Sequence, residues 1–362
     1  MARLVSSAFI LCALLGVLSC QALPPPTARE AARPEGPAGT AKPEDSGQKA
    51  EAKFEFDMTL GTGQKIDPYG PTPHEVVAEM IALAEVRKDD VVYDLGSGDG
   101  RIPIAAAKQA GARGVGIELR PELVKQSLKT AAEAGVADRV RFLEQDFFKV
   151  DFSDATAVLL YLYPRTLLEL RPLLLEKLNP GTRIVAYNYG MEGWPRDKEQ
   201  PVKHLSHGKL FMWIVPANVS GIWECSLVRE GRRRWWGARQ ATTFTLHLEQ
   251  TFQQVRGKAR IGRREAPLED VKIKGDTLSL TLKLSREEPL ALVGKVAADS
   301  IQGTAGVAKN GAASAEGITW QAKRVPGTKV SIDPGLPPLP PREAEGGPPD
   351  SEQDPAPDNP EE

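Results

Sequence analysis

One stretch, residues 91–101, constrains the fold of this chain more than any other. An apolar run from Val91 to Tyr93 leads to Asp94, and three glycines at alternate positions then lead into an alanine-rich segment, residues 102–110. This order predicts a buried strand, a tight turn and the start of a helix. Glycine is needed where a backbone turns sharply and lies close to a ligand, because a Cβ would block the approach. The turn is therefore a candidate ligand site, beside the free N–H groups of a helix start.

Acidic residues also end the next two apolar runs of the chain. Glu118 follows residues 114–117, and Asp146 follows residues 140–145. In a parallel sheet the carboxyl ends of the strands meet at one edge, which is where open α/β sheets bind their ligands. We therefore expect Asp94, Glu118 and Asp146 to lie around one crevice.

Two nucleoside-binding interpretations compete for the glycine loop. The dinucleotide fingerprint G-x-G-x-x-G needs a third glycine that packs the helix against the sheet. Here the glycines are residues 96, 98 and 100, and Arg101 stands at the third position of that fingerprint. Asp94 would also repel a phosphate, whereas a carboxylate suits a ligand that carries an ammonium group. A doubly wound fold with an empty crevice is the alternative without function.

The pattern D-L-G-S-G-D-G-R, residues 94–101, resembles the first motif of class I (seven-β-strand) S-adenosylmethionine (SAM) methyltransferases. Together with Pro71-Thr72-Pro73 and residues 114–118, it is similar to a bacterial branch related to the FAM173-type protein-lysine methyltransferases, and more distantly to the Dot1 fold. The resemblance covers about residues 66–216.

This resemblance implies SAM as the cofactor and assigns a part of it to each acidic residue. Asp94 and the glycine loop would hold the methionine end, Glu118 the ribose, and Asp146 the adenine amino group, with Phe147 against the adenine ring. The implied cofactor-binding residues are Asp94, Gly96, Ser97, Gly98, Asp99, Gly100, Glu118, Asp146 and Phe147.

The same resemblance implies an N-methyltransferase whose favoured acceptor is a protein lysine. Tyr161 and Tyr163 correspond to the segment beside the methyl group and are the candidate catalytic residues, while Trp194 corresponds to a tryptophan after the fifth strand. A lysine must first lose a proton, and its free pKa of about 10.4 makes this cost roughly 4 to 5 kcal/mol at pH 7. Desolvation lowers such a pKa by as much as about 3 to 5 units. A dry aromatic slot would therefore favour the transfer, and Tyr161, Tyr163, Tyr187 and Trp194 are side chains of the type that forms one.

Strand and helix patterns alternate over residues 54–216, which predicts a first domain with a doubly wound, Rossmann-like α/β sheet that residues 211–215 would close. Residues 217–327 instead alternate apolar and polar side chains, which predicts a small antiparallel all-β domain, either a barrel or a sandwich. Residues 21–53 and the Pro-rich, acidic residues 328–362 have no apolar periodicity, and we expect both to be disordered.

The first twenty residues, 1–20, resemble an export signal. Arg3 is their only charge, and an apolar run that is short for a bilayer span leads to a lipobox-like ending at Cys20. This predicts a signal and a bacterial lipoprotein, acylated on Cys20 and therefore exported and membrane-anchored, or else periplasmic. An uncleaved anchor with a cytoplasmic-facing enzyme is the alternative.

The net charge of −2 gives no general argument for a nucleic-acid partner, so the expected partner is a protein or small-molecule amine. No metal site is predicted, because His204 and His207 lack a third ligand nearby. The export signal motivates a second function, since SAM is made in the cytosol. In that case the chain would be a lipid-anchored binding protein with a non-catalytic methyltransferase fold and a ligand-binding β domain. The intact motifs favour the enzyme.

Overall fold

The computed structural model describes residues 68–335, except residues 204, 206, 230–240, 284–288 and 310–311. The predicted signal with Cys20 lies outside the described residues. So do residues 21–53 and 336–362, which we expect to be disordered. Within the described part, no helix has the length and apolar character needed to cross a membrane.

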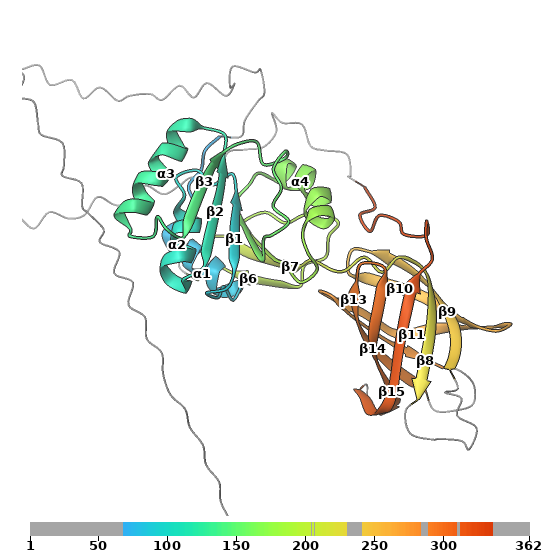
Figure 1. The fold of residues 1–362 in the computed structure, drawn as a ribbon. Helices are drawn as coiled ribbons and strands as arrows, with labels where there is room; N and C mark the ends of the chain where they lie inside the picture. Colours follow the sequence, from blue (N-terminus) through green and yellow to red (C-terminus); the bar gives the residue numbers. More distant parts are fainter. Residues whose placement is uncertain are drawn as a thin grey trace, which may run out of the picture. The chain divides into compact units, whose positions relative to one another are not determined.

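A seven-stranded sheet forms the first part of the described chain, in the order β3-β2-β1-β4-β5-β7-β6 (Figure 1). Strands β1 to β5 run parallel, whereas β7 is antiparallel to both β5 and β6. The parallel strands β1 and β4 are buried throughout, because helices cover both faces of the sheet. The strands are β1 (Val91–Leu95), β2 (Arg113–Glu118), β3 (Val140–Glu144), β4 (Ala157–Leu160), β5 (Arg183–Tyr187), β6 (Lys198–Pro201) and β7 (Lys209–Ile214). The helices are α1 (His74–Leu83), α2 (Arg101–Ala110), α3 (Pro121–Glu133) and α4 (Pro164–Lys177).

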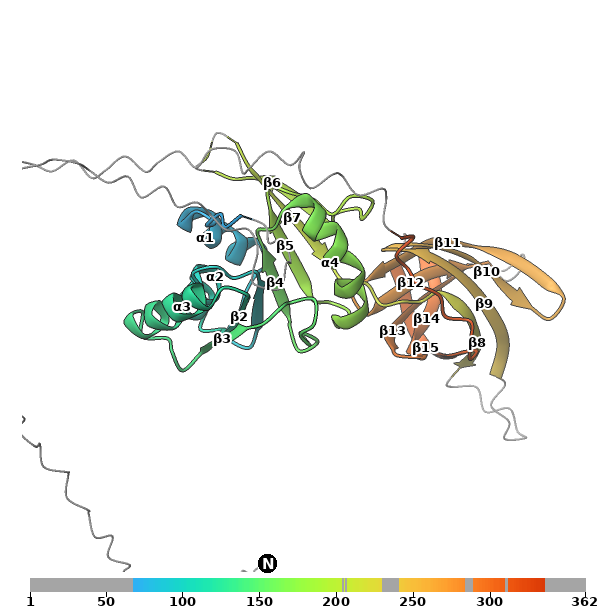
Figure 2. The same cartoon turned by 90° about the horizontal axis from the view of Figure 1, so that it is seen from above.

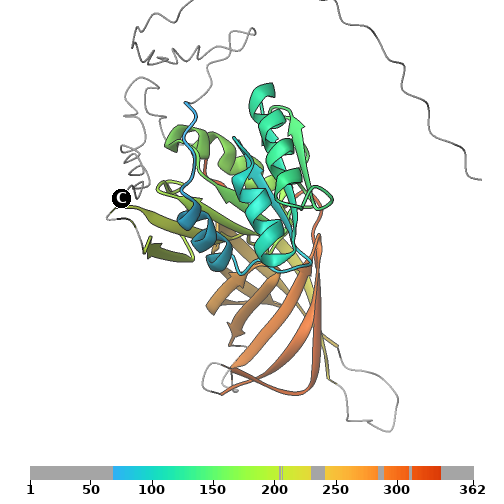
Figure 3. The ribbon, with the colours of Figure 1, turned by 90° about the vertical axis from the view of Figure 1, so that its left-hand side faces the viewer.

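The helices divide between the two faces of the sheet (Figure 2). Helices α1 and α2 pack on the face that carries Val92 and Leu159, and Figure 3 shows them next to each other there. Helix α4 packs on the opposite face, over Tyr93 and Val158. Helix α3 packs against α2 and against Phe142 of β3. This three-layer arrangement is the predicted Rossmann-like fold.

The chain reverses its direction of travel across the sheet at β1. Strand β1 pairs with β2 on one side and with β4 on the other, so the carboxyl end of β1 faces a topological switch point. Asp94 and Glu118 lie at the carboxyl ends of β1 and β2, and Asp146 lies two residues beyond the end of β3. The fold therefore brings the three predicted carboxylates to one edge of the sheet.

Two elements differ from what the sequence pattern indicates. The apolar pattern predicts a strand over residues 157–163, but β4 ends at Leu160 and α4 begins at Pro164, so Tyr161 and Tyr163 belong to a connecting loop. The expectation that residues 211–215 close the sheet is wrong, because β6 pairs with β7 outside it. The sequence of β6, K-E-Q-P, has no apolar alternation and hence gives no strand signal.

A closed antiparallel barrel follows, in the order β10-β11-β12-β13-β14-β15-β8-β9, which decides between the barrel and the sandwich. Alternate residues face inward, such as Trp223 and Cys225 of β8 and Trp320 of β15. The strands are β8 (Gly221–Arg229), β9 (Ala241–Thr251), β10 (Gln254–Ile261), β11 (Arg264–Lys274), β12 (Thr277–Leu282), β13 (Leu290–Ala297), β14 (Ser300–Lys309) and β15 (Ala312–Arg324).

The turn between β9 and β10 contacts the residues that follow β5. The Phe252 ring stacks on Trp194 at 5.7 Å between centroids and 8° between planes. The indole N–H of Trp194 donates to the Gln253 side chain at 3.1 Å. Beyond the barrel, residues 328–335 differ from the expected disordered tail, because they pack against the fold. Their Asp333 forms an ion pair at 2.8 Å with Arg171 of α4, and the Arg171 side chain is 1 % exposed. Phe252 thus belongs to the same apolar cluster as the sheet residues under α4.

Candidate active site

The glycine loop between β1 and α2 has a conformation that only glycine adopts easily. Gly96, Gly98 and Gly100 have φ angles of +90°, +51° and +78°, in the left-handed region. A Cβ on Gly98 would lie 2.4 Å from the Tyr69 ring, and a Cβ on Gly100 would lie 2.7 Å from the Phe142 ring. The bare backbone is therefore required both by its dihedral angles and by its close neighbours.

Asp94 is a buried carboxylate in an unfavourable electrostatic position. Its side chain precedes the loop, and the residue is 3 % exposed. Burial raises the pKa of Asp94 well above its usual value, and the nearby carboxylates of Glu118 and Asp99 raise it further. A cation bound here would stabilise the ionised form. The surroundings of Asp94 thus fit a ligand with an ammonium group.

Ser97 and Glu118 offer further groups to a ligand at this loop. The Ser97 hydroxyl is buried, and within the described part of the chain it has no hydrogen-bond partner. Glu118 Oε1 accepts hydrogen bonds from the N–H groups of Leu119 and Arg120, at 2.9 and 3.0 Å. Its Oε2 accepts from the Gly98 N–H at 2.9 Å. A carboxylate oxygen has two lone-pair sites, so Oε2 retains capacity for a hydroxyl.

Residues after β3 and β4 complete the surroundings of the loop. A Cβ on Gly96 would lie 3.0 Å from Leu162 and 3.8 Å from the Phe147 ring. Asp146 accepts a hydrogen bond from the Phe148 N–H at 3.0 Å and pairs with Lys149 at 3.2 Å. Phe147 is thus adjacent to the glycine loop, whereas the carboxylate of Asp146 is oriented by its own turn.

Four tyrosines lie at or just beyond the ends of β4 and β5. The rings of Tyr161 and Tyr187 lie 4.8 Å apart at an angle of 47°. Burial raises the pKa of Tyr161 to about 12, with contributions from Tyr187 and Tyr189, so these phenols share one partly dry region. Tyr163 follows Tyr161 by two residues, at the N-cap of α4.

Trp194, in contrast, does not join this aromatic group in the way that the sequence suggests. It is 3 % exposed and packs between Trp213 and Phe252 in the apolar core. Its partner Phe252 comes from the barrel, far along the chain, and no local pattern around Trp194 indicates that contact. Sequence reasoning also missed Tyr69, which touches the loop but lies outside any periodic segment. Leu162, which lies next to Gly96, belongs to the segment that the resemblance places beside the methyl group.

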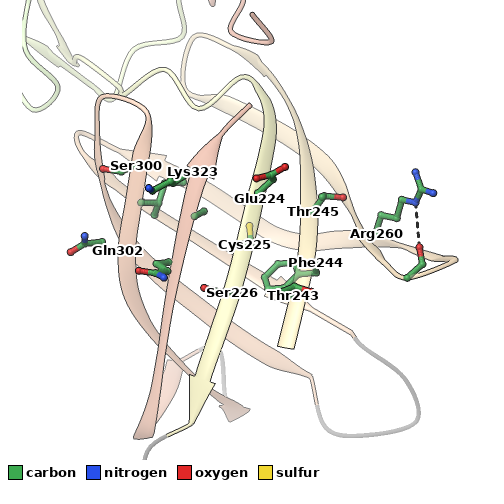
Figure 4. Close-up of a pocket in the computed structure, with 14 residues that line it drawn as sticks. Glu224, Cys225, Ser226, Thr243, Phe244, Thr245, Arg260, Ser300, Gln302 and Lys323 are labelled. Carbon is green, nitrogen blue, oxygen red and sulfur yellow. Dashed lines mark hydrogen bonds between the residues drawn. The ribbon is translucent and has the colours of Figure 1, made fainter. Parts of the chain in front are cut away.

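The barrel carries a groove of about 610 Å³, which none of the predicted site residues lines (Figure 4). Its walls include Glu224 and Ser226 of β8 and Thr243 and Thr245 of β9, which alternate with inward-facing residues. The lining also includes Cys225 and Phe244 of the barrel core, and polar side chains are expected on the outer face of any such barrel, so the lining alone indicates no ligand. Among the described residues, no three or more His, Cys, Asp or Glu side chains are grouped so that they could hold a metal ion.

Comparisons with known proteins point to the strand–helix region. A family model described as the ANTKMT methyltransferase domain matches residues 94–198. The protein-lysine N-methyltransferase of Saccharolobus islandicus is 42 % identical over 128 residues, which are 35 % of this chain and 80 % of the relative. The chain belongs to the same methyltransferase family as this relative. The match confirms the predicted class, a SAM-dependent methyltransferase domain with SAM as the methyl donor, and favours the enzyme over the binding protein.

Two further relatives show how far the likeness extends. The adenine nucleotide translocase lysine N-methyltransferase of Mus musculus is 34 % identical over 155 residues, which are 42 % of this chain and 65 % of the relative. The chain thus leaves about a third of that relative's length unmatched. A solved structure described as an RNA methyltransferase from Salinibacter ruber, in complex with S-adenosyl-L-homocysteine, is 49 % identical, with a TM-score of 0.40. It corresponds to 41 % of this chain and 96 % of the other. The family model ends before β8, so it does not include the barrel.

Proposed function

We propose that this protein is a SAM-dependent N-methyltransferase that acts on the side-chain amine of a lysine in a protein. The observation that carries the proposal is Asp94, a buried carboxylate with a raised pKa directly before a bare glycine loop. Such a position favours a bound cation, and the amino group of SAM is one. The relatives that are named as lysine methyltransferases support the choice of acceptor.

In this proposal the residues at the strand ends each hold one part of the cofactor. Asp94 binds the ammonium group, and the unpartnered hydroxyl of Ser97 offers a hydrogen bond beside it. The free capacity of Glu118 Oε2 takes a ribose hydroxyl. Asp146 accepts from the adenine amino group, and Phe147 packs on the ring. The cofactor would supply a methyl group: the nitrogen of a neutral amine would bond to the methyl carbon in line as the S–C bond breaks, and S-adenosylhomocysteine would leave.

The tyrosine group supplies the acceptor slot. Tyr161 and Tyr163 would line it, and the Tyr187 ring lies 4.8 Å from the ring of Tyr161. Because the pKa of Tyr161 is about 12, its phenol stays protonated near pH 7 and is no base there. The slot acts instead by keeping water away, which lowers the pKa of an entering lysine toward neutrality. Positioning of the neutral amine then accounts for most of the rate.

Product analysis tests the proposed reaction. The full chain is incubated with methyl-labelled SAM and a bacterial cell extract, and the products are hydrolysed and separated by mass spectrometry. We expect label in methylated lysine from the protein fraction, and none with the Asp94→Asn variant. Label that nuclease treatment removes, or label found only in free small amines, would contradict the proposed acceptor.

We further propose that the enzyme is an exported lipoprotein anchored through Cys20. The lipobox-like sequence supports this, and the anchor concerns residues outside the described part of the chain. The mass of the mature N-terminus tests it. An acylated Cys20 in the membrane fraction, which is lost in Cys20→Ala, is the expected result. A chain that still begins at Met1, or a mature N-terminus without lipid, would overturn the proposal.

A further inference from the structure

A short segment ahead of α1 lies over the glycine loop. We name residues 68–73 the strap. A Cβ on Gly98 would lie 2.4 Å from Cε2 of Tyr69 and 3.2 Å from its Cδ2, so the tyrosine ring rests directly on the bare backbone of the loop. The other groups of Gly98 are also engaged, since its N–H donates to Glu118 at 2.9 Å and its carbonyl accepts from Ser127 at 3.1 Å. Tyr69 therefore covers a fixed point of the loop.

Arg101 fastens the strap to the loop. Its Nη1 donates to the carbonyl oxygen of Thr72 at 2.7 Å, and Thr72 is 4 % exposed. Its Nε and Nη2 bind the two carboxylate oxygens of Asp99 at 2.9 and 2.6 Å. The guanidinium of Arg101 thus joins the strap to the loop, because a planar guanidinium can donate to a carboxylate and to a carbonyl oxygen at the same time.

Asp99 interacts both with Tyr69 of the strap and with Asp94 of the candidate cofactor site. Its carboxylate accepts a hydrogen bond from the Tyr69 hydroxyl, and burial together with the negative charge of Asp99 raises the pKa of Tyr69 to about 12. The hydroxyl therefore stays protonated and keeps donating. Asp99 also acts on Asp94, because its charge helps to raise the pKa of that buried carboxylate. Tyr69 and Asp94 consequently share Asp99 as a common neighbour.

We propose that Tyr69 is a further cofactor-site residue, which the strap holds as a wall over the methionine end of SAM and which slows its dissociation. The inference rests on the proposed function, because it needs the cofactor at the glycine loop. It adds a residue from a segment that precedes the first helix, outside the strand-end pattern. The strap contacts the loop through the Arg101 hydrogen bond to Thr72, the Asp99 hydrogen bond and the Tyr69 ring contact, and none of these involves a strand pairing of the sheet.

The alternative is that Tyr69 only helps the fold, and Tyr93 offers a matched control for it. Tyr93 has the same kind of network, since its hydroxyl donates to Asp154 at 2.7 Å and accepts from Arg141 at 3.2 Å. That network is built from β1, β3 and the loop before β4, and none of its members belongs to the glycine loop. Tyr93→Phe therefore removes an equivalent hydroxyl without touching the strap.

The test measures affinity and dissociation rate of SAM and S-adenosylhomocysteine for the full chain and its variants, by calorimetry and stopped flow. We expect Tyr69→Ala to weaken both ligands about ten- to a hundredfold, mainly through faster dissociation, which is the range for losing one buried aromatic contact. Tyr69→Phe should lose less than Tyr69→Ala, because it keeps the ring. Arg101→Met should also speed dissociation, because it releases Thr72. Tyr93→Phe should leave the affinity unchanged.

The outcomes separate this inference from the proposed function. If wild type binds neither ligand, the proposed function fails. If wild type binds both and Tyr69→Ala dissociates at the wild-type rate, only the role of Tyr69 is overturned. A loss in Tyr93→Phe as large as that in Tyr69→Ala would also overturn it, because the effect would then reflect general stability.

Discussion

Asp94 is unfavourable for the stability of the free protein. Its carboxylate is almost wholly buried, and burial and two neighbouring carboxylates raise its pKa. A buried charge without a counter-ion destabilises a fold, and the group avoids the penalty only by binding a proton. An apolar side chain would pack in this place without that cost. A carboxylate here is therefore best explained by a cation that the free protein lacks.

The first prediction is a pH dependence of SAM binding. The free site favours protonated Asp94, whereas a bound ammonium group favours the ionised form, so binding releases a proton. Affinity should therefore fall as pH drops below the raised pKa of Asp94, by up to about tenfold per pH unit. Calorimetry in buffers of different ionisation enthalpy counts the released proton. Asp94→Asn should bind more weakly and lose this dependence, and an unchanged pH slope in that variant would contradict the assignment.

Residues at strand ends were predictable, whereas residues in irregular segments were not. Asp94 and Glu118 follow apolar runs, so the rule that parallel strands share a carboxyl edge places them together. Tyr69 comes from a segment with no period, and only the folded chain brings it to Gly98. The family resemblance alone suggests a place for Trp194 near the slot, but its environment depends on Phe252, 58 residues further along the chain.

At the scale of elements, the strand-turn-helix unit β1–α2 is the part of the fold that the local sequence predicts best. The apolar run, the glycines and the helix-forming alanines agree on one structure, and α2 (Arg101–Ala110) covers the whole alanine-rich segment. Strand β6 has no such agreement, since its polar residues give no strand signal, although it pairs with β7 at a sheet edge. The barrel was predictable as antiparallel strands, but its closure depends on the pairing of β8 with β15, nearly a hundred residues apart.

A second prediction concerns the glycine loop as an element. Gly98→Ala should weaken SAM binding at least about tenfold, because the new methyl group would displace the Tyr69 ring and strain a backbone at φ +51°. Gly135→Ala is the control, since Gly135 has φ +71° and nothing within 4 Å of the added Cβ. Both variants carry backbone strain, so equal SAM affinities in calorimetry would show that the ring contact does not matter.

At the scale of the whole molecule, the sheet region and the barrel are joined by a buried ionic contact. Arg171 and Asp333 are 1 % and 7 % exposed, and Arg171 also donates to the carbonyl oxygens of Glu192 and Gly335. Its guanidinium lies over the Phe252 ring at 5.2 Å. These contacts bind the segment beyond the barrel and the β9–β10 turn to α4. We therefore expect the two regions to unfold together.

The third prediction tests this coupling. Arg171→Met leaves Asp333 buried without its partner, which should lower the free energy of unfolding by about 3 to 5 kcal/mol in urea titrations. The double variant Arg171→Met with Asp333→Asn should recover part of the loss. Arg256→Met is the control, because Arg256 and Glu249 form an ion pair with 85 % and 70 % exposed side chains. A change below about 1 kcal/mol is expected there, and an equally small change for Arg171→Met would contradict the coupling.

The central claim is that carboxylates at successive strand ends hold one SAM molecule over the glycine loop. A crystal structure of the full chain with S-adenosylhomocysteine tests it most directly. We predict the ligand's amino nitrogen within hydrogen-bond distance of Asp94, its ribose hydroxyls at Glu118 and its adenine against Phe147. A ligand bound elsewhere, for example in the groove of the barrel, or one whose amino group lies away from Asp94, would contradict the account.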